Sequence, residues 1–465
     1  MQRCLARAAI LTAFFVLGCG APDLTAPFTD VGSLEFAIMG LPSGGHAAIA
    51  VSGNGTSHTV NNSSTISLAP GTYTVTASAV QTGGSTWYPN VGSQTVAVGL
   101  GQTRGVTIRF GRLPVSGAFV ADLDLFDSAM VAYMTARGIG AGTLAISSHG
   151  QVIYRRAFGW RDSAHTSLLS PNAMMRLASN SKPVTAAAIR RLISQGLLTL
   201  DYKPFASLGL APAGNVVDTR IYNITVQHLL DHTGGWNRNV AGDIMFKSRE
   251  ISQALDIATP PTKTQFAQWA MTQPLQHAPG IATSYSNFGY LVLGLVVEKI
   301  TGQSFPDYVK ESIFTGSAVD EIIAGRSLRA DRDPREPFYS DPYKGCSVFF
   351  VETCVLVPWP DGGWHMEAFD SCGGLVGSAP AMATFLEAYW INGQPRVPGT
   401  QASFIFFGSL DGTFTLMRQR TDGSNFVALF NQRTDPSGLV YDDIRATLDG
   451  VADRLFPAAS VAGRF

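Results

Sequence analysis

Polar and apolar residues alternate along much of the chain between residues 31 and 112. Runs such as Tyr73–Ala77, Gln94–Val98 and Val106–Phe110 alternate with a period of two, which is the pattern of half-exposed β-strands. Turn residues separate these runs at short intervals, and the whole stretch contains no lysine. The pattern predicts a small all-β sandwich over residues 31–112.

This predicted β-module resembles the immunoglobulin-like modules that precede the enzymatic part of bacterial surface enzymes. Trp87 and Tyr88 are its candidates for stacking on a carbohydrate. The other interpretation is a spacer that holds an enzyme away from the membrane, and we favour the spacer.

Helical and strand patterns mix over residues 115–465. Asp124–Arg137 has the spacing of a helix, and the runs Thr143–Ser148 and Gln151–Phe158 form a hairpin across a His-Gly turn. Several helical patterns follow in the middle of the chain. This second unit is therefore expected to be of the α+β class.

Strand patterns return near the C-terminal end. They cover Phe404–Gly408, Thr413–Arg418 and Phe426–Phe430, and an amphipathic helix follows over Tyr441–Phe456. Strands at both ends of the unit, with helices between them, predict one antiparallel sheet that distant segments complete. An inserted, mostly helical lobe is expected between them.

The N-terminal residues have the features of an export signal. Two arginines precede an apolar run over residues 8–17, and a Gly-Cys pair ends it at Cys19. The run is shorter than the about 20 apolar residues that span a bilayer, so it indicates a signal peptide over residues 1–19, with a linker over residues 20–30. A cysteine in this place resembles a bacterial lipoprotein signal and makes Cys19 a candidate lipidation site; cleavage elsewhere, with Cys19 discarded, is the alternative. A periplasmic or outer-surface location follows.

Composition narrows the classes of function. The chain has 465 residues, of which 45% are apolar, so two or three packed units are expected. Charged residues make up 14% and the net charge is −1, so nothing favours binding to nucleic acid or to an anionic membrane surface. A membrane partner is expected only through the lipid anchor.

Three cysteines lie beyond the signal segment: Cys346, Cys354 and Cys372. In an oxidising compartment two of them can pair, most simply Cys346 with Cys354 across a local hairpin.

His228 and His232 have the spacing of zinc ligands on a helix, but no third ligand accompanies them, and packing or capping roles are expected. The sequence implies no metal and no organic cofactor.

The strongest candidate for chemistry is a serine and a lysine three residues apart. Ser179 and Lys182 stand at the start of an amphipathic helix that runs to about Gly196, so both side chains lie on one face. The positive end of the helix dipole favours negative charge on a serine oxygen, and Lys182 must be at least partly neutral to act as a base. Taken alone the spacing is a weak signal, because the alternative is a capping serine beside a solvated lysine.

Four segments in order strengthen the interpretation. Arg176–Ala186 resembles the nucleophile segment of the serine β-lactamase and penicillin-binding-protein superfamily, and Thr225–Gly235 is similar to the helix and turn that follow it there. Tyr285-Ser286-Asn287 matches the second motif of that superfamily, Tyr-x-Asn, and Ser371–Pro380 resembles its Gly-Gly segment. The resemblance runs from about residue 121 to 455 and is nearest to class C β-lactamases, D-Ala-D-Ala carboxypeptidases and esterases of the same fold.

The resemblance implies a role for each motif residue. Ser179 attacks a carbonyl carbon and becomes acylated, while Tyr285 and Lys182 handle its proton. Asn287 holds Lys182 or a substrate carbonyl by hydrogen bonds, or it caps the helix that begins at Phe288.

The third motif of the superfamily is Lys-Thr-Gly or His-x-Gly, and this sequence departs from it. Phe406 stands where the basic residue is expected, two residues before Gly408, and we expect both to line the substrate pocket. A phenyl ring cannot hold a substrate carboxylate. The backbone N–H groups of Ser179 and Ser409 are still expected to form the oxyanion hole.

The sequence therefore predicts a serine hydrolase that acts on small, uncharged esters or amides. A D-Ala-D-Ala carboxypeptidase or β-lactamase with a peptidoglycan-type substrate is the alternative within the same mechanism. The alternative of another class is a binding protein without catalysis that retains the fold. An insertion at about Arg326–Asp370 is expected to shape the pocket.

Overall fold

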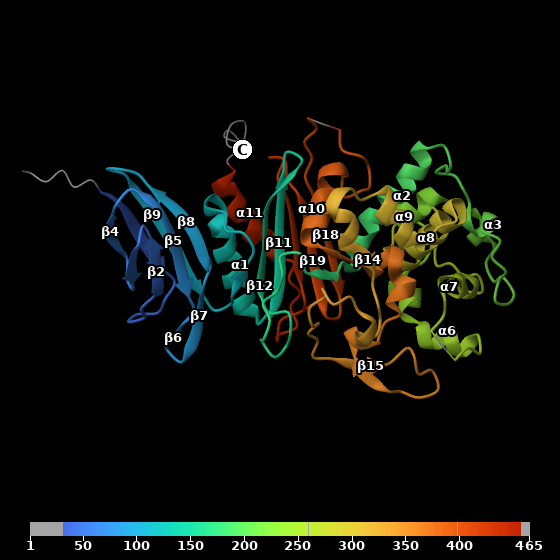
Figure 1. Ribbon diagram of the computed structural model, residues 1–465. Coiled ribbons are helices and arrows are strands. Elements are labelled where there is room, and N and C mark those ends of the chain that lie inside the picture. Colours follow the sequence, from blue (N-terminus) through green and yellow to red (C-terminus); the bar gives the residue numbers. More distant parts are fainter. Residues whose placement is uncertain (1–30, 259, 398, 457–465) are drawn as a thin grey trace, which may run out of the picture.

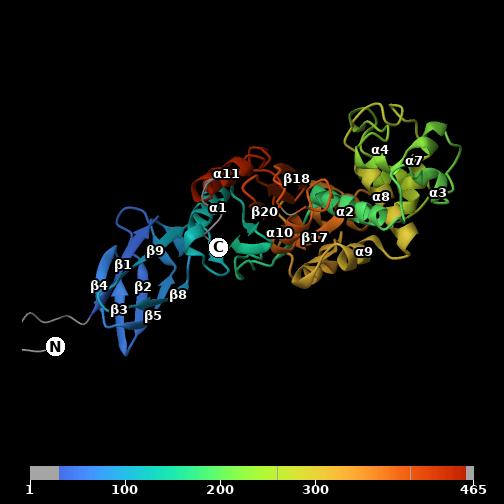
Figure 2. The same ribbon diagram turned by 90° about the horizontal axis from the view of Figure 1, so that it is seen from above.

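The computed structural model describes residues 31–258, 260–397 and 399–456. The predicted signal peptide, the linker and Cys19 lie outside the described residues and stay predictions. Among the described helices, none is long and apolar enough to cross a membrane. Figures 1 and 2 show three parts in a row: an all-β part, a central sheet and a helical lobe.

The all-β part consists of two sheets around one apolar core. One sheet has the strand order β4-β1-β9-β7-β6 and the other has the order β3-β2-β5-β8. In β5, buried residues alternate with exposed ones, and Tyr73 and Val75 point into the core beside Leu34 and Ile108. The alternation of polar and apolar residues in the sequence predicts this arrangement, with one face of the strand in the core and the other in solvent. The likeness to immunoglobulin modules in particular stays a prediction. The strands are β1 Gly32–Met39, β2 Ala48–Gly53, β3 Thr56–Val60, β4 Ser64–Leu68, β5 Gly71–Ser78, β6 Val80–Thr82, β7 Ser85–Pro89, β8 Ser93–Val98 and β9 Thr103–Gly111.

The central sheet has six antiparallel strands in the order β10-β12-β11-β20-β19-β18. Strands from the two ends of the unit meet where β11 pairs with β20, from Gly142 opposite Phe430 to Ser147 opposite Asn425. This pairing confirms that distant segments complete one antiparallel sheet. The strands are β10 Val115–Ser116, β11 Ala141–Ser148, β12 Gln151–Gly159, β18 Phe404–Leu410, β19 Thr413–Gln419 and β20 Asn425–Phe430.

Both faces of this sheet are covered by helices. Leu144 and Ile146 of β11 belong to the core beneath α1 and α11, whereas Ala145 belongs to the core beneath α2, α8 and α10. Successive strand residues point to opposite faces, so a strand buried on both sides has apolar residues at nearly every position. In Figure 1, α1 and α11 lie on the side of the all-β part. Their bounds are α1 Asp124–Arg137, α2 Ser181–Ser194, α8 Asn287–Thr301, α10 Ala379–Ala388 and α11 Ile444–Leu455.

The inserted lobe between β12 and β18 is mostly helical, as the sequence predicts (Figure 2). A small sheet, β13-β17-β14, leads the chain into the nucleophile segment, and a separate hairpin, β15-β16, carries a disulfide between Cys346 and Cys354. The further elements of the lobe are α3 Pro204–Ser207, α4 Val226–Leu230, α5 Arg238–Ala241, α6 Ser248–Ala254, α7 Lys263–Ala270, α9 Phe305–Ser312, β13 Met174–Arg176, β14 Ile322–Ala324, β15 Lys344–Cys346, β16 Leu356–Pro358 and β17 Leu375–Ser378.

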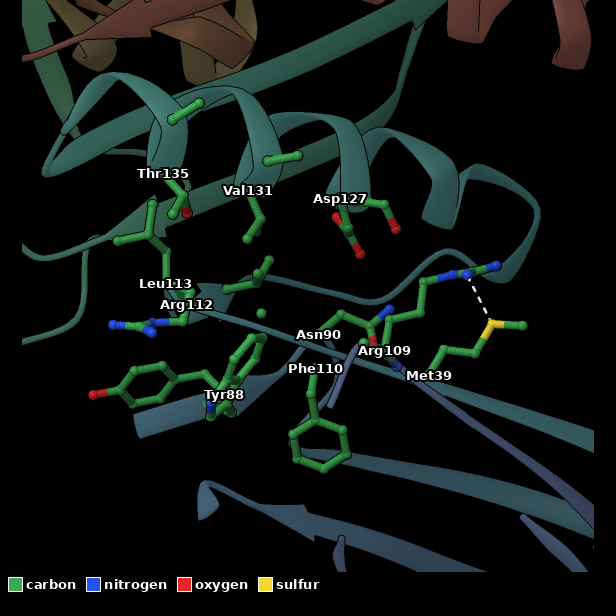
Figure 3. A pocket seen from close by; sticks show the side chains of 17 residues that line it. Met39, Tyr88, Asn90, Arg109, Phe110, Arg112, Leu113, Asp127, Val131 and Thr135 are labelled. Carbon is green, nitrogen blue, oxygen red and sulfur yellow. Dashed lines mark hydrogen bonds between the residues drawn. The ribbon is translucent and has the colours of Figure 1, made fainter. Parts of the chain in front are cut away.

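The candidate stacking residues Trp87 and Tyr88 lie at the junction of the all-β part and α1. They line a cleft of about 440 Å³ between the two (Figure 3). The Arg112 guanidinium lies 5.4 Å from the Trp87 ring centroid, and the Tyr88 and Trp160 rings meet edge to face with their centroids 5.8 Å apart. Both rings therefore contact other side chains of the chain, which favours the spacer interpretation over carbohydrate stacking.

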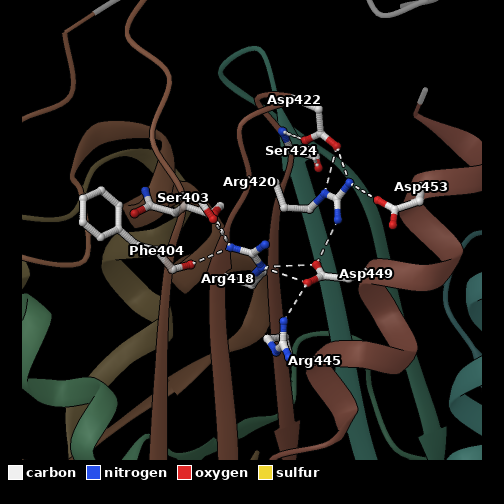
Figure 4. A network of polar contacts seen from close by, with 10 residues as sticks. Ser403, Phe404, Arg418, Arg420, Asp422, Ser424, Arg445, Asp449 and Asp453 are labelled. Atoms are coloured by element: carbon white, nitrogen blue, oxygen red, sulfur yellow. Dashed lines mark hydrogen bonds and ion pairs between the residues drawn. The ribbon is translucent and has the colours of Figure 1, made fainter. Parts of the chain in front are cut away.

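A network of charges fastens the C-terminal helix to the sheet (Figure 4). Asp449 of α11 accepts hydrogen bonds from Arg418 Nε at 3.2 Å and Arg420 Nη1 at 3.0 Å. Arg418 also donates to Ser403 Oγ and to the Phe404 carbonyl at the start of β18. The network thus ties the start of the edge strand β18 to α11.

Candidate active site

The nucleophile segment follows β13 in a tight 3-10 turn over Ala178–Asn180 and then enters α2. Ala178 has a φ of +47°, a left-handed conformation that costs free energy for any residue with a side chain. It is fully buried, so the surrounding packing maintains the conformation. The turn leaves the Ser179 side chain half-exposed at the N-terminal end of α2.

Strand β18 passes very close to this turn, which explains Gly408. A Cβ atom on Gly408 would lie 2.3 Å from the Leu177 carbonyl oxygen and 3.2 Å from Ala178 Cβ. Only glycine fits there, so the residue permits the approach of the strand rather than contact with a substrate.

Phe406 and Gly408 do not line the cavity that opens on Ser179, which corrects our prediction for both. Phe406 packs against the helical core and lines a second cavity, of about 260 Å³, that reaches Lys182 from another side. The physical reason is the alternation along β18, which turns Phe406 to the face covered by helices.

Lys182 is buried, with 1% of its surface exposed, so the alternative of a solvated lysine is wrong. Its Nζ lies 2.6 Å from Asn287 Oδ1 and 3.3 Å from Ser179 Oγ, and it also donates a hydrogen bond to the Cys372 carbonyl. The amine is thus surrounded by three oxygen atoms, one of which belongs to the candidate nucleophile.

Asn287 is not the cap of its helix, because the Ser286 side chain accepts the hydrogen bond from Gly289 N instead. The amide of Asn287 lies between Lys182 and a carboxylate that the sequence analysis missed, Asp243, to which Nδ2 donates at 2.7 Å. Burial raises the pKa of Asp243. Because Nδ2 faces Asp243, Oδ1 must face Lys182, and this orientation supports the holding role. A lone aspartate in the helical lobe carries no sequence signal that could have identified it.

Tyr285 lies above Ser179, with its hydroxyl 2.6 Å from Ser179 Oγ. The Lys182 ammonium position and the Arg238 guanidinium lie 4.7 Å and 4.9 Å from the ring centroid. The His232 ring lies beside it, tilted by 31°, with the two ring centroids 4.6 Å apart. Two basic side chains therefore lie against the ring of Tyr285.

The two histidines have structural roles. His228 forms a capping box with Thr225 at the start of α4, and His232 Nδ1 accepts a hydrogen bond from Ser286 N. Among the described residues, no group of three His, Cys, Asp or Glu side chains could hold a metal ion. Burial is the main cause that lowers the pKa of His232 to about 4, and the nearby Lys182 and Arg238 contribute to the same shift.

This shift predicts a loss of stability in acid. His232 has a pKa near 6.5 when unfolded and about 4 when folded, so the unfolded state binds more protons between these values. The free energy of unfolding is therefore expected to fall by on the order of 3 kcal/mol as the pH decreases from 6.5 to 4 because of this residue. Urea titrations of the wild type and of His232→Asn at several pH values check this. A variant that loses as much stability as the wild type would contradict it.

The cavity on Ser179 has a volume of about 390 Å³. Trp364 and Phe369 of the predicted insertion line it, together with Ser409 and the turn after β18. It also contains two arginines that the sequence analysis missed, Arg238 and Arg433. Arg238 follows no motif, and Arg433 lies three residues beyond β20, so only the fold brings them to the serine.

Cys372, the free cysteine among the described residues, does not suit a nucleophilic role. Its side chain is buried, and burial raises the pKa of the thiol to about 12. Its backbone carbonyl is the group that contacts Lys182.

Comparison with known proteins agrees with this geometry. The Beta-lactamase family model matches residues 126–441. Esterase EstB of Burkholderia gladioli is 31% identical over 222 residues, which are 45% of this chain and 50% of that protein. Penicillin-binding protein 4* of Bacillus subtilis (strain 168) is 29% identical over 195 residues, 41% of this chain and 40% of that protein. The chain thus spans about half the length, or less, of these curated relatives.

A solved structure supports the fold alone. The Beta-lactamase/D-alanine carboxypeptidase of Yersinia pestis superposes with a TM-score of 0.52 at 15% identity, over 72% of this chain and 98% of that one. The part of the chain after the all-β part therefore has the mixed α+β fold of β-lactamase-like proteins.

Proposed function

Since the chain belongs to the beta-lactamase family, we propose that it is a serine hydrolase that forms an acyl-enzyme at Ser179 and acts on small esters or amides. One observation carries the proposal: Ser179 Oγ lies 2.6 Å from the Tyr285 hydroxyl and 3.3 Å from Lys182 Nζ. A serine hydroxyl is a weak nucleophile unless a base lies within hydrogen-bond distance. Ser179 has two candidate bases at that distance, Tyr285 and Lys182.

The contacts of Lys182 suit the role of a proton acceptor. The Asn287 side-chain oxygen and the Cys372 carbonyl can only accept hydrogen bonds, so they take two N–H groups of the amine. In the neutral amine the remaining position is a lone pair, and it faces Ser179 Oγ. Lys182 can then receive the serine proton directly or by way of the Tyr285 oxygen.

In the proposed reaction, Ser179 Oγ attacks the carbonyl carbon and the bond to the leaving oxygen or nitrogen breaks. The serine proton passes through Tyr285 and Lys182 to that leaving atom. In the second half, water gives a proton to the same pair and attacks the acyl carbon. The bond to Ser179 breaks, and the serine oxygen recovers its proton.

The strand register supports Ser409 as an oxyanion donor. Leu410 pairs with Thr413 across a two-residue turn, so the next pair, Ser409 with Phe414, falls at a position without ladder hydrogen bonds. The N–H of Ser409 then points away from β19, and β18 is an edge strand that borders the Ser179 turn. Together with the Ser179 N–H it would supply the two donors that such a site needs.

An intact-mass measurement tests the acyl-enzyme directly. Protein mixed with p-nitrophenyl butyrate and quenched in acid is expected to gain the mass of one butyryl group, located by peptide mapping on Ser179. The same protein is assayed with a chromogenic cephalosporin, and faster turnover of the cephalosporin would favour the β-lactamase alternative. No acylation with either compound would favour a binding protein without catalysis.

We also propose that the enzyme is exported, with Cys19 lipidated and the all-β part serving as an immunoglobulin-like spacer. The basic and apolar pattern of residues 1–19 supports export, and a Cys346–Cys354 disulfide suits an oxidising compartment. Metabolic labelling with a palmitate analogue, lost in Cys19→Ala, tests the anchor.

A further inference from the structure

The cleft between the all-β part and α1 is separate from the candidate active site. Helix α1 covers one face of the central sheet, whereas α2, which begins directly after the Ser179 turn, covers the other (Figure 1). No residue lines both the cleft and the cavity on Ser179. A ligand in the cleft would therefore have no part in the proposed reaction.

Apolar side chains form most of the lining of the cleft. Phe110 of β9 and Leu113 line it from one side, and Val131 of α1 lines it from the other (Figure 3). The cleft follows α1 from Thr135 to Asp127, which is about 12 Å at about 1.5 Å per residue. An extended chain of roughly ten carbon atoms has this length, since a C–C bond is about 1.5 Å long. The cleft is thus long enough for an alkyl chain and has the apolar lining that such a chain needs.

One end of the cleft carries a positive charge that no acidic side chain neutralises. Arg112 is exposed, and no carboxylate in the described part of the chain lies within ion-pair distance of it. Its guanidinium lies 5.4 Å from the ring centroid of Trp87. The Trp87 Nε1 atom is buried and has no hydrogen-bond partner among the described residues. A buried N–H without an acceptor costs free energy, so a ligand oxygen that accepts from it would be stabilising.

The charged groups at the other end of the cleft are already paired. Arg109 forms an ion pair with Asp124 at 2.8 Å. Asp127 accepts a hydrogen bond from Tyr154 at 2.6 Å and lies 3.4 Å from Arg156. Among the described residues that line the cleft, Arg112 therefore has the one charge without a partner. An anionic group at one end of an apolar chain is complementary to this distribution of charge.

We propose that the cleft binds a straight-chain, medium-length fatty acid. Its carboxylate contacts Arg112 and the Trp87 N–H, and its alkyl chain lies between Phe110 and Val131. The ligand touches the all-β part on one side and α1 on the other, so its binding stabilises the contact between the two parts. The inference does not rest on the proposed function, because it uses no residue of the cavity on Ser179.

A series of straight-chain carboxylates with six to fourteen carbon atoms tests the fit, with Kd measured by calorimetry below the micelle concentration. Each added methylene group is expected to lower Kd about four-fold, the effect of burying one CH₂. The gain should stop at roughly ten carbon atoms, where the chain fills the cleft. Decanoate that shows no saturable binding would overturn the inference, as would an affinity that rises by the same factor up to fourteen carbon atoms.

The head group is tested with octanoate and 1-octanol, which have the same chain length. The wild type is expected to bind octanoate about ten-fold or more tightly, the range of a charge-assisted hydrogen bond. In Arg112→Gln this preference should vanish because octanoate binds more weakly, while the Kd of 1-octanol stays the same. Arg104→Gln is the matched control, since Arg104 is an exposed arginine of the same strand that does not line the cleft.

Equal Kd values for octanoate and 1-octanol in the wild type would overturn the inference, and so would an unchanged preference in Arg112→Gln. Thermal unfolding establishes that both variants keep the wild-type fold. The proposed function is tested separately at Ser179, and either result there is compatible with either result here.

Photolabelling locates the bound chain. Decanoate with a diazirine near the end of its chain is irradiated with the full-length protein, and the labelled peptides are identified by mass spectrometry. The label is expected on peptides from residues 85–90 or 109–136, and an excess of unlabelled decanoate should suppress it. Label found only on peptides that line the cavity on Ser179 would place the fatty acid in the candidate active site and overturn the inference.

Discussion

Ser179→Ala is expected to lower the rate of p-nitrophenyl butyrate hydrolysis by at least about 10³-fold, because the variant lacks the atom that becomes acylated. Covalent labelling by a fluorophosphonate probe should disappear with it. The fold should persist, since the Ser179 side chain is half-exposed and its hydrogen bonds are to Tyr285 and Lys182. Initial rates, gel-based labelling and thermal unfolding measure the three effects.

Ser194→Ala is the matched control for this change. Ser194 stands at the other end of the same helix, is exposed and donates only to the Arg191 carbonyl. The fluorophosphonate probe should label this variant as it labels the wild type, and the variant should hydrolyse p-nitrophenyl butyrate at the wild-type rate. Undiminished labelling of Ser179→Ala would mean that the probe reacts elsewhere, and the acyl-enzyme would have to be assigned to another residue.

Tyr285→Phe is expected to lower kcat by about 10²–10⁴-fold with little change in KM. The substitution removes the one hydroxyl that lies 2.6 Å from Ser179 Oγ and leaves the ring in its place beside His232. Proton transfer from the serine would lose its shortest path, whereas the shape of the cavity would hardly change. Steady-state kinetics on the neutral ester measures both parameters.

Tyr290→Phe is a suitable control for that experiment. The Tyr290 ring also lies against His232, with the ring centroids 5.1 Å apart, but its hydroxyl donates to the Leu230 carbonyl instead of to Ser179. Its loss should affect stability more than turnover. If Tyr285→Phe kept more than about a tenth of the wild-type kcat, Lys182 alone would be the base, because general-base assistance is worth more than that.

Local patterns in the sequence were sufficient to predict many of the helices and strands. The predicted helix Asp124–Arg137 has the bounds of α1, and the predicted strands at both ends of the second unit correspond to β11, β12, β18, β19 and β20. These elements are set by the period of apolar residues and by nearby turn residues, all of which lie within one short window of the chain.

The cap of α8 shows the limit of such reasoning. Ser286 and Asn287 are both good capping residues, and a shift of one residue decides which of them faces the helix and which faces Lys182. That choice depends on Asp243, whose carboxylate lies 44 residues away in the chain and holds the Asn287 amide in one orientation.

The sequence alone determined the order of the motifs, the helix turn that places Ser179 beside Lys182, and the absence of a cation at Phe406. Only the tertiary structure decided that Tyr285, 106 residues further along, meets the serine, and that Arg238 and Arg433 line the same cavity. The physical reason is that spacing along a helix or strand fixes neighbours within a few residues. Contacts between distant segments follow from how buried surfaces pack, and no local pattern records that packing.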